Sequence, residues 1–343
     1  MEKINIEKAW EDYSSYLFVD TRSPAEFEED HVPRSYNLPI FDDTERKNIG
    51  ILYKADKQKA FDLGIDYYSK KLPGLVKEIR KLPRNKKIIV YCWRGGLRSK
   101  AIAQLIDLLG YSSYQLEGGY KAYRAFVREN LYKYQTDFRF IVLWGLTGTA
   151  KTKIIKRLKP AIDLEGLAQH RSSLFGAVGL NPRSQKYFES LLYFELEKLK
   201  GTGLVFIEGE SKKIGDVIIP SVIYNKMKNG VKVRIESSLK ARVKNTVKEY
   251  FLDENVEQIK SIIPLLKQKL GTKRVNELLQ WMQDKNYENV SEVLLTEYYD
   301  PLYRHTIDRM DYDYEIKADS ITKHIEKLNS IRSELLINSK KFQ

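Results

Sequence analysis

The pattern of apolar and polar positions predicts two α/β parts followed by a helical part. Short apolar runs predict buried strands, and at two places such a run is followed by a polar, glycine-containing loop and then a helical stretch. The clearest of these runs lie at residues 17–20, 87–91, 138–144 and 204–207. Because each run is short and bounded by polar residues, we expect strands rather than long buried helices.

From about Leu239 the apolar spacing becomes that of amphipathic helices, whose apolar stripes we expect to form a core. Two such stripes lie at residues 259–270 and 275–282. The chain is long enough for two domains and a helical extension, each with its own core. The expected divisions are a domain at 1–133, a linker at 130–136, an α/β domain at 137–238 and a helical extension at 239–343.

Cys92 is the only cysteine of the chain and lies between an apolar strand and an apolar helix. The loop after it contains Gly95 and Gly96, which allow its backbone N–H groups to turn inward, and it carries Arg94 and Arg98. A helix N-terminus and cationic neighbours favour a thiolate. We therefore predict that Cys92 is a nucleophile inside a cradle for an anion. A buried structural cysteine at a strand end is the alternative.

A second motif, at residues 145–152, has the form of a P-loop between a strand and a helical run. In such a loop the backbone amides hold a diphosphate, Lys151 reaches the terminal phosphate, and the Thr152 hydroxyl is placed to ligate Mg²⁺. Ala150 stands where the pattern has glycine, so its Cβ would crowd the phosphate or strain the turn. A chance match and a loop that binds nothing are the alternatives. The predicted phosphate-binding residues are Gly145, Thr147, Gly148, Thr149, Lys151 and Thr152.

The strand at 204–207 runs into Glu208 and Glu210, which is how P-loop proteins place a carboxylate near Mg²⁺ or a water molecule. We predict a catalytic role for Glu208, with solvated acids at a strand end as the alternative. The polar segment 163–176 predicts an active-site loop. His170 in this segment either takes part in the reaction or has only a structural role.

Charge and composition favour a nucleic-acid partner. The chain has 59 Lys and Arg against 46 Asp and Glu, a net charge of +13, and most of that excess falls after residue 130. Basic side chains bind phosphates, and the chain has 23 tyrosines, which stack on unpaired bases where they are exposed. Solvated helix faces are the alternative explanation for the basic residues. No signal peptide and no apolar run of about 18 residues is present, so we expect a cytoplasmic protein without a membrane partner.

The first part resembles a rhodanese domain, an α/β sheet whose cysteine carries sulfur as a persulfide. The resemblance rests on strand-Asp-x-Arg-Ser-Pro-x-Glu-Phe at 17–27, His-x-Pro and Asn-Leu-Pro at 31–39, and the loop at Cys92. The loop has one residue more than common single-domain rhodaneses, which suits selenophosphate, and its Cys-x5-Arg-Ser spacing also describes protein phosphatases. A charged insert at 44–68 is long for a rhodanese, and we expect it to form a helical cover over the Cys92 loop.

Over nearly the whole chain, the order of motifs resembles the tRNA 2-selenouridine synthase family. Its motifs are Cys-Trp-Arg-Gly-Gly-Leu-Arg-Ser, Gly-Leu-Thr-Gly-x-x-Lys-Thr, Leu-Glu-Gly-Leu-Ala-x-His-Arg, Glu-x-Glu-Ser-x-x-Ile-Gly and Tyr-Tyr-Asp-Pro-Leu-Tyr at residues 298–303. The chain departs from the family at Ala150, at Trp144 where a small residue is usual, and at Gly209 where an aspartate is commoner. The segment 298–304 is expected to be a turn that faces tRNA.

The resemblance implies a transferase that replaces the sulfur of 2-thiouridine at the wobble position of tRNA with selenium. It implies an S-geranylated intermediate made from geranyl diphosphate, followed by displacement with selenophosphate, with selenium on Cys92 or held in its loop. No tightly bound cofactor and no resident metal site is expected, although Mg²⁺ fits the P-loop. The implied partners are the anticodon region of tRNA and an enzyme that supplies selenophosphate.

Two other functions stay open from the sequence. The chain is alternatively an NTP-dependent rhodanese-type tRNA sulfurtransferase that uses a persulfide on Cys92. The second alternative is a nucleotide- or RNA-binding regulator without catalytic activity. The sequence also leaves open whether the P-loop prefers a prenyl diphosphate or a nucleotide.

Overall fold

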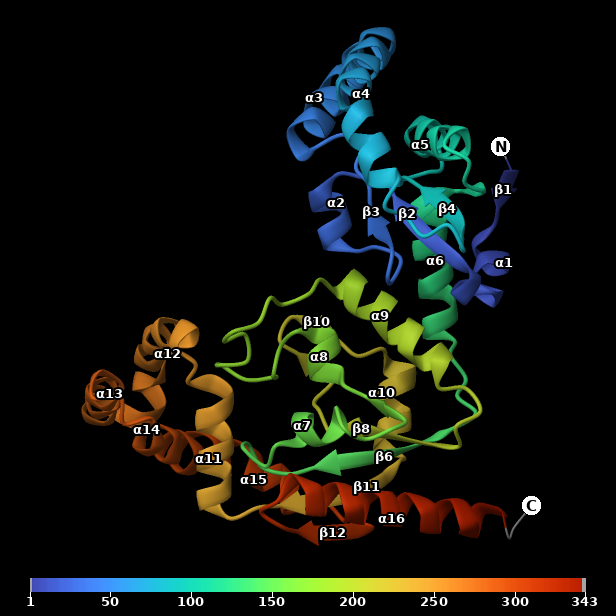
Figure 1. The fold of residues 1–343 in the computed structure, drawn as a ribbon. Coiled ribbons are helices and arrows are strands. Elements are labelled where there is room, and N and C mark those ends of the chain that lie inside the picture. Colours follow the sequence, from blue (N-terminus) through green and yellow to red (C-terminus); the bar gives the residue numbers. More distant parts are fainter. Residues whose placement is uncertain (1, 341–343) are drawn as a thin grey trace. The chain divides into compact units, whose positions relative to one another are not determined.

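The computed structural model describes residues 2–340, and the chain divides into two compact units. The first unit runs to Tyr132 and includes Glu189–Phe194, and the second contains the other described residues. Each unit is built around its own five-stranded parallel sheet (Figure 1). The predicted α/β fold class is therefore confirmed for both parts.

The sheet of the first unit has the strand order β1-β5-β4-β2-β3, and every neighbouring pair is parallel. Its strands are β1 (Glu2–Ile4), β2 (Tyr16–Asp20), β3 (Tyr36–Asn37), β4 (Lys87–Tyr91) and β5 (Ser113–Leu116). Its helices are α1 (Ile6–Glu11), the 3₁₀ turn η1 (Tyr13–Ser15), α2 (Pro24–Glu29), α3 (Asp43–Ala55), α4 (Lys57–Ile79), α5 (Leu97–Leu108) and α6 (Gly119–Tyr132). Because the strands are parallel, the loops after β2 and β4 leave the sheet at the same edge.

Local sequence explains how several of these elements begin. Ser23 caps helix α2 in a capping box with Glu26, and Pro24 occupies the first turn. The charged insert forms the paired helices α3 and α4, so its predicted helical character is confirmed. Arg22 is 1% exposed and pairs with Asp20 at the end of β2, which satisfies two charges inside the unit.

The second unit has a parallel sheet in the order β12-β11-β6-β8-β7, with the short antiparallel pair β9 and β10 apart from it. Its strands are β6 (Arg139–Trp144), β7 (Ala161–Ile162), β8 (Leu204–Glu208), β9 (Lys213–Ile214), β10 (Val217–Ile218), β11 (Val231–Glu236) and β12 (Tyr314–Lys317). Its first helices are α7 (Lys151–Ile155), α8 (Leu164–Ala168), α9 (Gln185–Lys198) and α10 (Ser221–Lys228).

A helical segment after residue 239 is present, but the chain then returns to the sheet. Strand β12 pairs with β11, and Ile316, Leu328 and Ile331 are buried in the same apolar core as Ile141 of β6. Helix α16 (Ile321–Lys340) therefore belongs to the P-loop unit. The helical extension expected over 239–343 is instead an insertion between two strands of one sheet.

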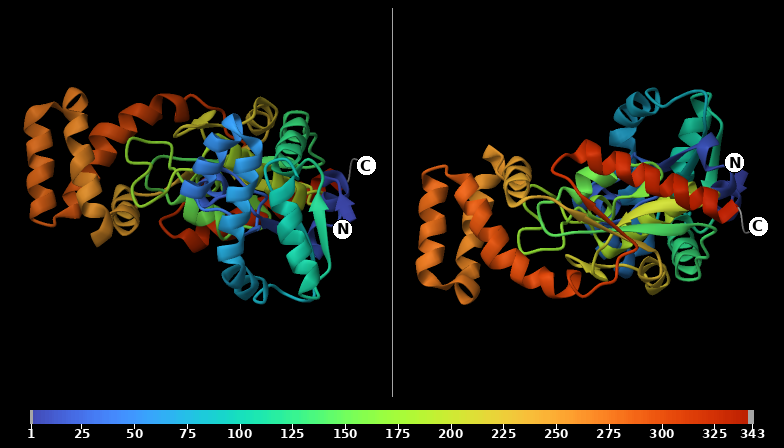
Figure 2. Two further views of the ribbon diagram at one scale, coloured as in Figure 1. Left: turned by 90° about the horizontal axis from the view of Figure 1, so that it is seen from above. Right: turned by 90° about the horizontal axis from the view of Figure 1, so that it is seen from below.

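The inserted helices gather at one end of the second unit, as both views of Figure 2 show for α12, α13 and α14. They enclose a separate apolar core that includes Ile259, Leu278 and Leu295. The insertion contains α11 (Leu239–Tyr250), η2 (Asp253–Asn255), α12 (Val256–Ile262), η3 (Ile263–Leu266), α13 (Lys267–Gln283), α14 (Tyr287–Val293), the π-helix η4 (Leu294–Tyr299) and α15 (Asp300–Ile307). None of the helices described over residues 2–340 is long and apolar enough to span a bilayer.

Candidate active site

The thiol of Cys92 lies directly after β4 and is only 3% exposed. The backbone N–H of Gly96 donates to Sγ over 3.2 Å, and the hydroxyl of Ser99 donates over 3.3 Å. Both donors come from the start of helix α5, so the sulfur faces the N-terminal end of a helix. Donors arranged in this way would also hold an anion on or beside the sulfur.

The loop around Cys92 is held in shape by Gln115, a buried residue of β5. Its side-chain amide lies 2.9 Å from the carbonyl oxygen of Gly95, 3.0 Å from that of Gly96 and 2.8 Å from the Ser99 hydroxyl. Sequence reasoning did not assign a role to Gln115, because it lies on a different strand. A role for Ser99 could have been predicted from the sequence, because Ser99 directly follows Arg98 in the loop motif.

The two predicted arginines of this loop differ in their surroundings. Arg98 donates to the carboxylate of Glu26 over 3.0 Å. Although burial favours the neutral form of Glu26, the nearby Arg98 lowers the pKa of this carboxyl below its usual value. Arg94 is exposed. The guanidinium of Arg98 is thus engaged in an ion pair, and the catalytic roles of both arginines stay predictions.

The P-loop stands in the predicted strand-loop-helix setting, between β6 and α7. It borders a cavity of about 400 Å³ in the second unit. Thr149 lies outside this cavity and donates its hydroxyl to the Leu146 carbonyl. The predicted phosphate-binding residues that do line the cavity are Gly145, Thr147, Gly148, Lys151 and Thr152.

Two glycines of the P-loop are required by close backbone contacts. A Cβ on Gly145 would lie 2.5 Å from the carbonyl oxygen of Ile235, and one on Gly148 would lie 2.9 Å from that of Arg242. Ala150 has the left-handed angles φ 64° and ψ 31°. An L-residue with a side chain pays about 1–2 kcal/mol in this region, so the alanine is strained where glycine would not be.

We expect Ala150→Gly to relieve this strain. Glycine also loses more backbone entropy on folding, so the net gain in the free energy of unfolding should be roughly 0.5–1 kcal/mol. Diphosphate should bind at least as tightly as to the natural protein. Thermal unfolding and calorimetric titration with inorganic diphosphate measure both effects.

The control is Ala177→Gly, at a position whose φ is not positive, which should destabilise the protein. Loss of diphosphate binding in Ala150→Gly would show that the loop is built around alanine.

Carboxylates form one side of the cavity, but Glu208 does not face it. Glu208 is 0% exposed, and one of its oxygens accepts from the backbone N–H of Glu165 over 3.3 Å. Its other oxygen has no hydrogen-bond partner among the described residues. Glu165 and Glu210 line the cavity itself, and the Thr152 hydroxyl donates to Glu165. The sequence favoured Glu208 because it ends the strand, whereas the side chains that reach the cavity are its neighbours.

Burial and mutual repulsion make these acids hard to ionise. Burial raises the pKa of Glu165 to about 8, and the charge of Glu210 adds to the effect. Burial also raises the pKa of Glu208 well above its usual value, and the charge of Glu165 is the next largest cause. Lys151, whose ammonium donates to the Gly145 carbonyl over 2.7 Å, opposes the rise for Glu165. The Glu165 carboxyl therefore holds its proton at neutral pH and releases it as the pH approaches 8.

The raised pKa of Glu165 predicts a pH-dependent stability. The folded protein holds this proton up to about pH 8, whereas the unfolded chain releases it near pH 4.3. The stability associated with the proton is complete below the unfolded pKa and is lost as the pH rises through the folded pKa. Glu165→Gln should therefore gain stability relative to the natural protein between pH 5 and pH 8.

Thermal unfolding at several pH values tests this expectation. The exposed Glu254→Gln variant serves as the control and should follow the natural protein. A stability difference for Glu165→Gln that does not change with pH would contradict a raised pKa.

Two departures from the family pattern are physically coupled. A Cβ on Gly209 would lie 2.4 Å from the indole of Trp144, so the ring occupies the space that a side chain at position 209 would need. Trp144 and Gly209 both line the cavity. The small residue at 209 therefore leaves the space that the large ring at 144 fills.

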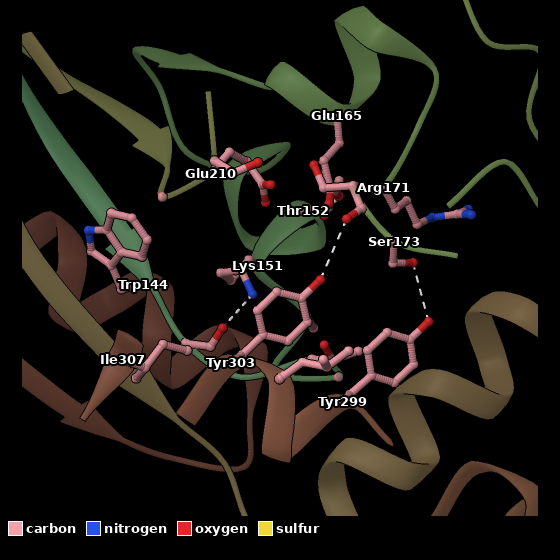
Figure 3. Close-up of a pocket in the computed structure, with 18 of the residues that line it drawn as sticks. Trp144, Lys151, Thr152, Glu165, Arg171, Ser173, Glu210, Tyr299, Tyr303 and Ile307 are labelled. Carbon is pink, nitrogen blue, oxygen red and sulfur yellow. Dashed lines mark hydrogen bonds between the residues drawn. The ribbon is translucent and has the colours of Figure 1, made fainter. Parts of the chain in front are cut away.

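Tyrosines form the side of the cavity opposite the carboxylates, with Lys151 between the two sides (Figure 3). Tyr299 ends the π-helix η4, and Tyr303 lies in α15. Their segment, 298–304, is helical, so the expectation of a turn is wrong. The rings of Tyr299 and Tyr303 line the P-loop cavity, and the contact with tRNA expected for this segment stays a prediction.

A rhodanese-like domain joined to a P-loop domain is the class of protein that these two units define. The rhodanese-like domain model matches residues 5–126, and the model of the tRNA 2-selenouridine synthase AAA domain matches residues 138–330. The chain belongs to the tRNA 2-selenouridine synthase family.

Relatives of that name align with nearly the whole chain. The tRNA 2-selenouridine synthase of Shewanella pealeana is 31% identical over 91% of this chain and 94% of that protein. The one of Pseudomonas fluorescens is 32% identical over 83% of this chain and 86% of that protein. Among solved structures, a rhodanese-related protein of Thermoplasma volcanium is 22% identical over 38% of this chain and 93% of that one, with a TM-score of 0.24.

Proposed function

We propose that this protein replaces the sulfur of 2-thiouridine at the wobble position of tRNA with selenium, in two chemical steps. The observation that carries the proposal is the presence, in one member of this family, of a cysteine cradle and a P-loop cavity. The first step alkylates sulfur with geranyl diphosphate, and the second displaces the alkylated sulfur with selenium from selenophosphate.

The P-loop cavity is suited to the first step. The sulfur of 2-thiouridine forms a bond to C1 of the geranyl group while the bond from C1 to the diphosphate oxygen breaks, and the base loses its N3 proton. Lys151 and the loop amides neutralise the departing diphosphate. Mg²⁺ would bind through Thr152 and the phosphate oxygens and add positive charge.

The Cys92 loop is suited to the second step. Selenophosphate held beside Cys92 bonds through selenium to C2 of the base, the geranyl thiolate leaves, and water then cleaves the Se–P bond and releases phosphate, so that selenium stays on C2. Alkylation turns a poor leaving group into a good one, so the first step prepares the second. The donors from Gly96 and Ser99 would hold the anionic selenium species.

The two sites should fail in different ways when mutated. Cys92→Ser keeps the size of the side chain but loses the soft nucleophile, so S-geranylated tRNA should accumulate without selenouridine. Lys151→Ala should block geranylation and, for lack of a leaving group, selenation as well. Mass analysis of tRNA nucleosides after incubation with geranyl diphosphate and selenophosphate measures both products.

Presynthesised geranylated tRNA bypasses the first step and therefore tests whether the two sites carry out separate steps. It should restore selenation in Lys151→Ala but not in Cys92→Ser. Rescue of both variants, or of neither, would contradict this division of the chemistry. Thiolation that consumes ATP would favour the sulfurtransferase instead.

Basic residues of the chain should bind the tRNA phosphates, so affinity should fall steeply with salt. The logarithm of the association constant should decrease with the logarithm of salt concentration by about 0.7 to 0.9 per phosphate neutralised. Titration of the anticodon stem-loop between about 50 and 200 mM salt measures the slope. Binding that is unchanged over this range would argue against a tRNA-sized contact.

A further inference from the structure

Tyr299 and helix α15 present an apolar stripe to the P-loop cavity, and Tyr299 also packs in the core of the inserted helices. The members of the stripe recur at the spacing i, i+3, i+4 and i+8, which places them on one helical face. Leu302 is 45% exposed although it is a leucine on this face. An apolar surface beside a phosphate cradle needs a partner, and no described helix or strand fills the cavity. The members of the stripe are Tyr299, Leu302, Tyr303 and Ile307.

The stripe is fixed relative to the phosphate cradle by a buried ion pair. Arg242 of helix α11 donates to both carboxylate oxygens of Asp300, the first residue of α15, and both side chains are 5% exposed. The same guanidinium donates to the carbonyl oxygen of Thr147 in the P-loop over 2.8 Å. A ligand held by the loop amides therefore meets the stripe at a set distance.

The tyrosine hydroxyls are directed toward polar groups in the wall of the cavity. Tyr299 shares a hydrogen bond of 3.2 Å with the Ser173 hydroxyl, and Tyr303 reaches the Ser172 carbonyl at 3.5 Å. Figure 3 shows both hydroxyls directed toward the segment that carries Arg171 and Ser173. Because the polar ends of the rings are engaged there, the rings offer mainly carbon to the cavity.

A second, smaller cavity of about 20 Å³ lies behind these rings. Tyr250 and Tyr299 line both cavities, so they stand between the two. The lining of the smaller space is mainly apolar, with Thr147 and Thr246 as its polar residues, so it suits a hydrocarbon better than the polar edges of a nucleobase. Its other apolar lining residues are Phe175, Phe251, Ile259, Leu294 and Leu295.

We infer that the stripe of α15 binds the hydrocarbon chain of a prenyl diphosphate, and that Tyr299 together with Tyr250 limits the length of that chain. The inference rests on the proposed function and names the residues that select its substrate. The diphosphate occupies the P-loop, the chain lies along Leu302 and Tyr303, and its end meets the Tyr299 ring. A prenyl chain is favoured over a nucleotide because Leu302, the tyrosine rings and the smaller cavity offer carbon surface on this side of the loop.

The test measures binding to the full chain by calorimetry with four ligands: inorganic diphosphate, geranyl diphosphate, farnesyl diphosphate and ADP. Geranyl diphosphate should bind at least tenfold tighter than inorganic diphosphate and tighter than ADP, because burial of the hydrocarbon contributes to its affinity alone. Tyr299→Ala joins the two cavities, so the affinity for farnesyl relative to geranyl diphosphate should rise at least tenfold.

Matched variants separate the length limit from general loosening of the helices. Tyr299→Phe keeps the ring, and Tyr298→Ala removes the neighbouring ring that lies outside both cavities, so neither should change the farnesyl-to-geranyl ratio. If Tyr299→Ala does not fold, Leu302→Gln at the exposed part of the stripe still decides. It should weaken geranyl diphosphate about tenfold and leave inorganic diphosphate unchanged, unlike Leu265→Gln at an exposed leucine outside the cavity.

The outcomes distinguish the two proposals. Equal affinity of the natural protein for geranyl and inorganic diphosphate, or tighter binding of ADP, would overturn both the use of a prenyl donor and this inference. Preference for geranyl diphosphate that survives Leu302→Gln, with an unchanged length ratio in Tyr299→Ala, would overturn the inference alone.

Discussion

The ion pair between Arg242 and Asp300 is the interaction on which the second unit's site depends. Breaking a buried pair by removing one partner typically costs about 3–5 kcal/mol, because the remaining charge is left without compensation. Arg242 also donates to the carbonyl oxygen of Thr147 in the P-loop. One side chain therefore fixes the position of the P-loop relative to the helix that begins at Asp300. Neither the cradle nor the stripe would define a substrate on its own.

A similar principle operates in the first unit, where Gln115 holds the cysteine loop from a neighbouring strand. In both places a loop proposed to bind an anion is shaped by a side chain distant in sequence. Parallel sheets make this possible, because the loops that follow neighbouring strands leave at one edge. The reactive groups of each loop are neighbours in the sequence, whereas the side chain that fixes the loop conformation comes from an adjoining strand or helix.

The acids near the P-loop show how burial changes the meaning of a motif. Glu208 ends its strand as predicted, yet it lies behind the cavity, and Glu165 takes the position beside Thr152. Sequence reasoning identified a carboxylate at the strand end but had no means to rank the three acids, because the ranking depends on which side chains water and ligand can reach. Ala150 is the opposite case, since the loop motif alone led us to expect strain in the turn, and the left-handed backbone of Ala150 agrees with it.

The sequence by itself determined the two α/β parts, the cysteine loop, the P-loop and the family, because each depends on residues that are neighbours along the chain. Only the tertiary structure decided that β12 returns to the P-loop sheet, that Gly209 makes room for Trp144, and that Tyr299 faces the cavity. Apolar spacing identifies the face of a helix that avoids water, but it does not identify what that face meets. The apolar face of α15 meets the cavity beside the P-loop, and only the packing of the helix in the folded protein places it there.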